Sequence, residues 1–122
     1  MFSYEFYKVL HLSGLILTFT GLVGIFMVRW NSPELKKSVR LLGALTHGIG
    51  LLIILVSGFG LAARLGLFGG LPGWVYAKIA IWIIVGFLMF LVKRKSNLGW
   101  PLYIIIVSAG FAAAYIAVNK PF

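Results

Sequence analysis

The chain has 122 residues, of which 61% are hydrophobic and 16% aromatic, and its mean hydropathy is +1.06. Soluble domains contain about 45–50% apolar residues, so this composition predicts one integral membrane domain that covers residues 1–122. Eleven Lys and Arg against two acids give a formal charge of +9. These bases cluster at the ends of apolar runs, where they meet lipid headgroups, which argues against nucleic acid as a partner. The lack of cysteine excludes disulfides, thiolate catalysis, iron–sulfur clusters and Cys-ligated zinc.

Four apolar runs approach or exceed the roughly 20 residues that a helix needs to cross a bilayer. They predict an all-α bundle of four transmembrane helices over residues 4–29, 33–65, 73–93 and 100–118. The second helix is expected to begin near Pro33, since Ser32 can cap it and Glu34 complements its dipole. A segment rich in Gly and Pro, residues 65–73, predicts the loop that follows. The first run lacks the basic segment and cleavage site of a signal peptide and is expected to be retained.

The distribution of basic residues predicts the orientation of the bundle. The links between helices 1 and 2 and between helices 3 and 4 carry Arg29, Lys36, Lys37, Arg40, Lys93, Arg94 and Lys95. The opposite side carries Lys8, Arg64 and Lys120, with Lys78 set deeper. Because cytoplasmic loops carry the excess of Lys and Arg, both termini are expected on the non-cytoplasmic side.

Small residues recur on one face of each of the first two predicted helices, together with both histidines. The two stripes are His11, Gly14, Thr18 and Gly21, and Gly43, His47, Gly50 and Gly58. Helices in lipid associate through close packing of small-residue faces, so these stripes predict inward-facing or docking surfaces. A homo-oligomer could also form through the same glycine-rich faces.

Each histidine has two interpretations. His11 and His47 can hydrogen-bond a hydroxyl or carbonyl of a neighbouring helix and add packing specificity, or they can serve as ligands. His11 lies 20 residues and His47 16 residues from the turn near Asn31. Their depths in the bundle are therefore expected to differ by four residues, or about 6 Å at 1.5 Å per residue. They are therefore expected to be neighbours in depth.

Lys78 also has two interpretations, because it lies between Trp74 and Trp82 at steps of four in the third helix. It can extend its ammonium to the headgroups along its aliphatic stem. Alternatively, the two indoles can form an aromatic wall around a bound group, and the ammonium can meet an anionic ligand such as a carboxylate-bearing small molecule.

Four segments carry a resemblance to a known family: residues 6–11 (FYKVLH), 28–29 (VR), 71–79 (LPGWVYAKI) and 118–122 (VNKPF). Together they resemble the small bacterial membrane proteins of the HemJ-type protoporphyrinogen IX oxidases and, more loosely, CopD-like and SirB-like four-helix proteins. The resemblance implies a multi-pass protein of the bacterial plasma (inner) membrane that binds haem b and oxidises protoporphyrinogen IX. It also implies that the helix 1 histidine, His11, and the helix 3 lysine, Lys78, are the functional residues.

The chemistry of haem extends this expectation to further residues. Haem iron accepts imidazole nitrogen, so His11 is the candidate axial ligand, with His47 or Lys78 as the candidate second ligand. Arg64 or Lys78 suits the haem propionates, because cationic donors pair with carboxylates. Gly14 is expected to leave open space beside His11, and Trp74 to contribute to the cofactor's surroundings.

Two other classes of function stay open. One is a non-catalytic assembly or interaction subunit whose glycine stripes dock another helix. The other is a metal-handling or transport protein, suggested by the CopD-like resemblance, with His11 and His47 as metal ligands.

Overall fold

The computed structural model describes residues 2–32 and 34–119. Its long helices are α1 (Tyr4–Asn31), α2 (Lys37–Arg64), α3 (Gly73–Lys95) and α4 (Trp100–Asn119), with short 3-10 helices η1 (Leu67–Gly69) and η2 (Ser96–Leu98). In length and composition, four helices of the described chain are able to cross a membrane. The all-helical fold with four such helices is thereby confirmed, and it suggests a multi-pass membrane protein.

The start of α2 differs from the sequence prediction. α2 begins at Lys37 rather than near Pro33, which lies outside the described residues. The Ser32 hydroxyl accepts a hydrogen bond from the backbone N–H of Glu34 at 3.3 Å. This bond closes a local turn, and residues 34–36 that follow are not helical. The capping serine of the fold is Ser3, whose hydroxyl accepts from the backbone N–H of Phe6 at 3.2 Å.

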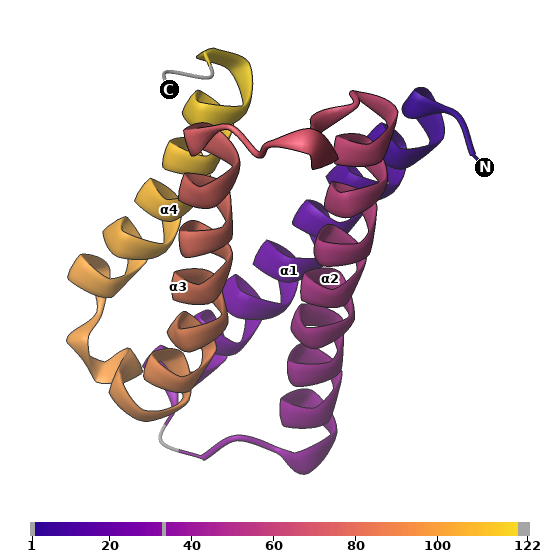
Figure 1. The fold of residues 1–122 in the computed structure, drawn as a ribbon. Helices are drawn as coiled ribbons and strands as arrows, with labels where there is room; N and C mark the ends of the chain where they lie inside the picture. Colours follow the sequence, from indigo (N-terminus) through magenta and orange to yellow (C-terminus); the bar gives the residue numbers. More distant parts are fainter. Residues whose placement is uncertain (1, 33, 120–122) are drawn as a thin grey trace.

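The helices form two antiparallel pairs, α1 with α2 and α3 with α4 (Figure 1). The links within both pairs lie at one end of the bundle, which we call the link end. The two ends of the chain and η1 lie at the opposite end. All seven bases of the predicted cytoplasmic side therefore gather at or near the link end, as the alternation of the helices requires.

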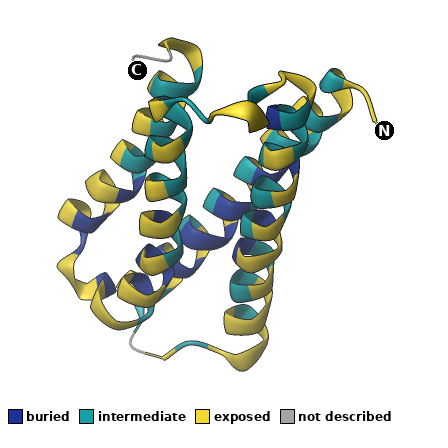
Figure 2. Ribbon diagram, in the orientation of Figure 1, coloured by how far each residue is buried: buried dark blue, intermediate teal, exposed yellow. Residues whose placement is uncertain are grey.

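The hydrophobic core lies toward the link end, where the second half of α1 meets α3 and α4 (Figure 2). Its buried members are Leu22, Ile25, Phe26, Val85, Leu88, Met89, Val92, Leu102 and Ile106. Within the described chain, none of these comes from α2. α2 meets this core only through partly buried residues such as Val39 and Leu51, and a second kind of contact holds it against α1.

That contact is close backbone packing between α1 and α2. A Cβ atom placed on Gly21 would lie 2.6 Å from the carbonyl oxygen of Gly43, and one on Gly50 would lie 2.5 Å from Thr18 Oγ1. Such distances exclude any side chain larger than hydrogen, so the two backbones touch directly. The glycine faces expected from the sequence thus pack against each other within one chain. They are not exposed for docking a second copy or another helix.

Candidate functional site

His11 on α1 is positioned by a serine of α2. The His11 Nδ1 lies 3.0 Å from the Ser57 hydroxyl oxygen, and Ser57 is fully buried. Gly58 lies beside the imidazole, because a Cβ atom placed there would be 3.5 Å from His11 Cε1. The ring is therefore held in the α1–α2 interface, with a glycine making room for it.

The hydrogen bonds of Ser57 define the tautomer of His11. The Ser57 hydroxyl donates to the carbonyl oxygen of Ile53 at 2.6 Å, in contact also with that of Ile54 at 3.2 Å. A hydroxyl has only one proton, so toward His11 the Ser57 oxygen acts as an acceptor and Nδ1–H is the donor. In the neutral imidazole, Nε2 then carries a lone pair. This is the arrangement that orients a histidine for ligation through Nε2.

His47 has a similar arrangement in a more enclosed place. Its Nδ1–H donates to the carbonyl oxygen of Thr18 at 2.9 Å, and the residue is 3% exposed. Its Nε2 is buried and has no hydrogen-bond partner within residues 2–32 and 34–119. For both histidines, the expected hydrogen bond to a neighbouring helix is therefore observed.

The two histidines lie at different levels of the bundle. His47 bonds to Thr18, seven residues along α1 from His11, and this spacing corresponds to about 10 Å at 1.5 Å per residue. The sequence-based separation of about 6 Å was too small, because counting from the turn ignored the delayed start of α2. The two imidazoles are thus held about two helical turns apart along α1.

Lys78 fits the neighbourhood of His11 better. It is half-buried on α3, and its ammonium lies within electrostatic range of the His11 imidazole. The second indole of its stripe is used elsewhere, since Trp82 Nε1–H donates to the carbonyl oxygen of Leu51 on α2 at 2.9 Å. The expected wall of two indoles around one ligand is therefore reduced to Trp74, which is half-buried in the first turn of α3.

Of two further predicted site residues, Gly14 is placed differently from expectation, whereas Arg64 lies at the surface where it was expected. A Cβ atom on Gly14 would lie 3.0 Å from the carbonyl oxygen of Gly50, so α2 fills the space beside Gly14 that was expected to be open. Arg64 is exposed in the last turn of α2, at the end of the bundle that also holds the chain ends. Its position is compatible with a partner at the membrane surface.

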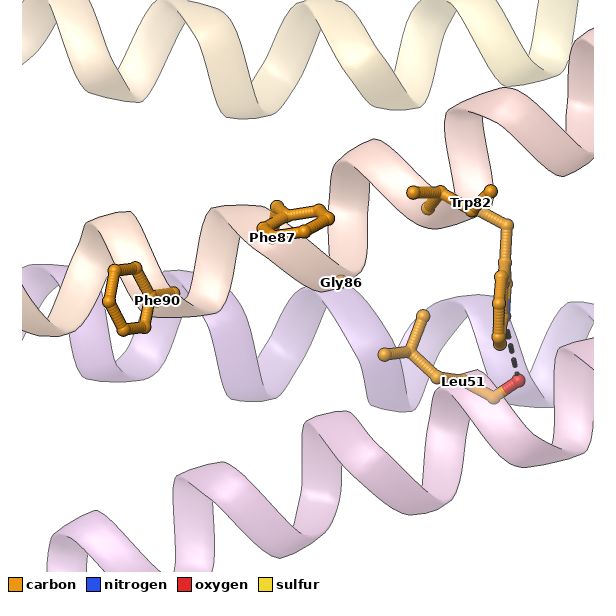
Figure 3. A pocket seen from close by; sticks show the side chains of 6 residues that line it. Leu51, Trp82, Gly86, Phe87 and Phe90 are labelled. Carbon is orange, nitrogen blue, oxygen red and sulfur yellow. Dashed lines mark hydrogen bonds between the residues drawn. The ribbon is translucent and has the colours of Figure 1, made fainter.

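An apolar groove of about 460 Å³ lies between α2 and α3 (Figure 3). It is lined by Leu51, Trp82, Ile83, Gly86, Phe87 and Phe90. The hydrogen bond from the Trp82 indole to the Leu51 carbonyl crosses one end of the groove. In the middle of the groove, Gly86 has no side chain to fill the space. No predicted ligand residue lines this groove.

Of the two α2 residues beside the His11 ring, Gly58 belongs to the predicted small-residue stripe, whereas Ser57 was missed by the sequence analysis. Ser57 and Gly58 follow His47 by ten and eleven residues, or about three helical turns. The sequence therefore already indicated that both lie near the same face of the helix as His47. A serine that follows a glycine stripe on an apolar helix is a candidate partner for an imidazole on the facing helix.

Comparisons with known proteins add no relative. No protein family, curated protein or solved structure matches this chain. Within the described residues, His, Cys, Asp and Glu form no group of three or more that could hold a metal ion.

Proposed function

We propose that the chain is a haem-binding protein of the bacterial plasma membrane, in which His11 would ligate the haem iron. The observation that carries the proposal is the buried Ser57 hydroxyl that accepts from His11 Nδ1–H and leaves Nε2 with its lone pair. Proteins usually orient a ligating histidine through a hydrogen bond made by the ring nitrogen that does not bind the metal. The sequence resemblance to the HemJ-type oxidases supports the same residue.

The surroundings of His11 fit the remainder of a haem site in chemical type. Lys78 is within electrostatic range of the imidazole and offers either a second ligand or a cation for a propionate. Arg64 offers a guanidinium at the surface of the same end of the bundle. When bound, haem supplies the electron-transfer chemistry, and the chain's own residues supply orientation, charge pairing and exclusion of water.

The resemblance further suggests that the substrate is protoporphyrinogen IX and that both termini face away from the cytoplasm. The gathering of bases at the link end supports that orientation. In this reading, His11 and Lys78 lie in the half of the bundle nearer the non-cytoplasmic surface. His11 holds the cofactor, and Lys78 binds a carboxylate or the cofactor itself.

The test of haem binding is an absorption spectrum of the purified protein after titration with haem. We expect a Soret band that His11→Ala abolishes. His47→Ala is the matched control, because it removes a second imidazole at another level of the same interface and should retain the band. A protein without a Soret band after haem is supplied, or with one that His11→Ala leaves unchanged, would exclude the proposal.

The oxidase activity is tested separately, by following the fluorescence of protoporphyrin IX formed from protoporphyrinogen IX by membranes that contain the protein. Lys78→Met keeps the length of the side chain and removes its charge. We expect Lys78→Met to lower this rate while His47→Ala preserves it. Haem binding without oxidation would instead indicate an electron-transfer or assembly role for the loaded protein.

A further inference from the structure

A second site lies at the link end of the bundle, away from His11. A cavity of about 370 Å³ is lined by Arg29, Leu35, Arg40 and Lys93. Its three cations come from three different helices, α1, α2 and α3. Arg29 Nε donates to the backbone carbonyl of Lys93 at 3.0 Å, which ties the end of α1 to the end of α3. Among the described residues, those that line the cavity include these three cations and no carboxylate.

The beginning of α2 adds to the positive potential of the cavity. The N-terminus of a helix carries a partial positive charge and normally attracts acidic residues or a capping oxygen. α2 has neither, since its first turn contains no acidic residue and its N-cap, Lys36, makes no side-chain hydrogen bond. Lys37 and Arg40 follow instead. An anion in the cavity would offset both the helix dipole and the mutual repulsion of the three cations.

The apolar groove between α2 and α3 lies deeper along the same pair of helices. Phe90, at one end of the groove, is one helical turn from Lys93 in the cavity. Trp82 is eleven residues from Lys93, so the groove extends about 16 Å toward the middle of the bundle. A cationic pocket at the headgroup level is thus followed by an apolar groove at the level of the hydrocarbon.

We propose that these two features form one binding site for an anionic phospholipid. Its phosphate is held by Arg29, Arg40 and Lys93, and an acyl chain lies in the groove lined by Phe90, Gly86 and Trp82. Basic pockets between membrane helices bind anionic headgroups in this way, and guanidinium groups match phosphate oxygens in geometry. The site shares no residue with the proposed haem site, because none of His11, Ser57 and Lys78 lines the cavity or the groove.

The headgroup part is tested by native mass spectrometry of the full chain with phosphatidylglycerol and with phosphatidylcholine. We expect preferential retention of phosphatidylglycerol. Replacing Arg40 and Lys93 by Gln should weaken its binding about twenty-five-fold, at about five-fold for each charge. The charge-matched pair Lys37→Gln and Lys95→Gln removes two cations of the same end that do not line the cavity, and should have a much smaller effect.

Equal losses in the two double variants would mean that the bases act only as a diffuse charged surface, and would overturn the proposal. Arg40→Gln and Lys37→Gln alone provide a second matched pair, because both residues are exposed and neither change disturbs the core. Retained helical circular dichroism identifies the variants that fold.

The acyl part is tested with Gly86→Leu, which places a side chain in the groove where a Cβ atom would be 3.7 Å from Leu51 Cδ1. Gly24→Leu is the control, since no atom lies within 4 Å of a Cβ at that position. We expect Gly86→Leu to weaken phosphatidylglycerol binding and Gly24→Leu to preserve it. Inorganic phosphate should not displace the lipid at the same concentration. Displacement by phosphate, or equal binding by both glycine variants, would identify a soluble-anion site instead.

Discussion

The Nδ1 of His11 on α1 lies 3.0 Å from the hydroxyl oxygen of Ser57, which is 46 residues away in sequence, on α2. The same interface holds the close backbone contacts of Gly14, Gly21 and Gly50. The packing that brings α1 and α2 together therefore also orients the imidazole. A mutation that separates these two helices should affect the candidate ligand as well as the stability of the fold.

Ser57→Ala tests the positioning of His11. It removes the acceptor of the Nδ1–H bond, so the imidazole loses its fixed tautomer and orientation. Under the proposed ligation, haem affinity should fall about 10–100-fold, as for other partners of metal-bound histidines. Haem titration followed at the Soret band measures this change. Ser13→Ala is the matched control, because the Ser13 hydroxyl donates only to the carbonyl of Val9 in its own helix. Equal affinities in the two variants would show that Ser57 does not position the ligand.

Gly21→Ala tests the α1–α2 interface. The added methyl group would lie 2.6 Å from the carbonyl oxygen of Gly43 and 2.7 Å from the backbone nitrogen of His47, so the helices must separate. Overpacking of this kind costs about 1–3 kcal/mol. Unfolding in mixed detergent, followed by circular dichroism, measures the loss.

Gly24→Ala, one turn further along the same helix, is the control for Gly21→Ala. A Cβ atom at Gly24 meets no atom within 4 Å, and Ala favours helix over Gly by about 1 kcal/mol. Gly24→Ala should therefore leave stability unchanged or slightly higher. If both alanine variants were equally stable, the close approach of α1 and α2 would be wrong.

Features that depend on one helix at a time could be predicted from the sequence. The length of the apolar runs predicted four helices, and the predicted bounds of α1, α3 and α4 are within a few residues of the observed ones. The periodicity of the small residues predicted which faces of α1 and α2 pack together. The start of α2 was missed because Ser32 can cap a helix or close a turn, and the choice depends on the path of the link.

Features that depend on the relative positions of two helices could not be predicted from spacing. Three features depend on how far one helix is shifted along another. They are the axial distance between His47 and His11, the hydrogen bond from the Trp82 indole to Leu51, and the cavity shared by Arg29, Arg40 and Lys93. A periodic pattern specifies which face of a helix packs, but it does not specify this shift. His11 could be proposed as a ligand from the sequence, whereas its hydrogen-bond partner Ser57 required the structure.

Trp82→Phe tests the tie between α3 and the α1–α2 pair. It removes the Nε1–H donor to the Leu51 carbonyl and keeps most of the aromatic surface. Hydrogen bonds between membrane helices contribute about 0.6 kcal/mol on average, so a loss of that order is expected in the free energy of unfolding. Trp100→Phe is the control, because Trp100 is 66% exposed. An identical stability for both variants would mean that the Trp82 bond does not hold α3 in place.

The proposed orientation can be tested by single-cysteine labelling, because the natural sequence contains no cysteine. Gly69→Cys places a thiol in η1, at the end of the bundle that holds both chain ends, where a Cβ atom meets nothing within 4 Å. Asn97→Cys places one in η2 at the link end, where Asn97 is exposed. If the excess of bases faces the cytoplasm, a membrane-impermeant maleimide should label Gly69→Cys in intact spheroplasts. It should label Asn97→Cys only after the membrane is permeabilised. The reverse labelling pattern would show that all four helices have the opposite orientation.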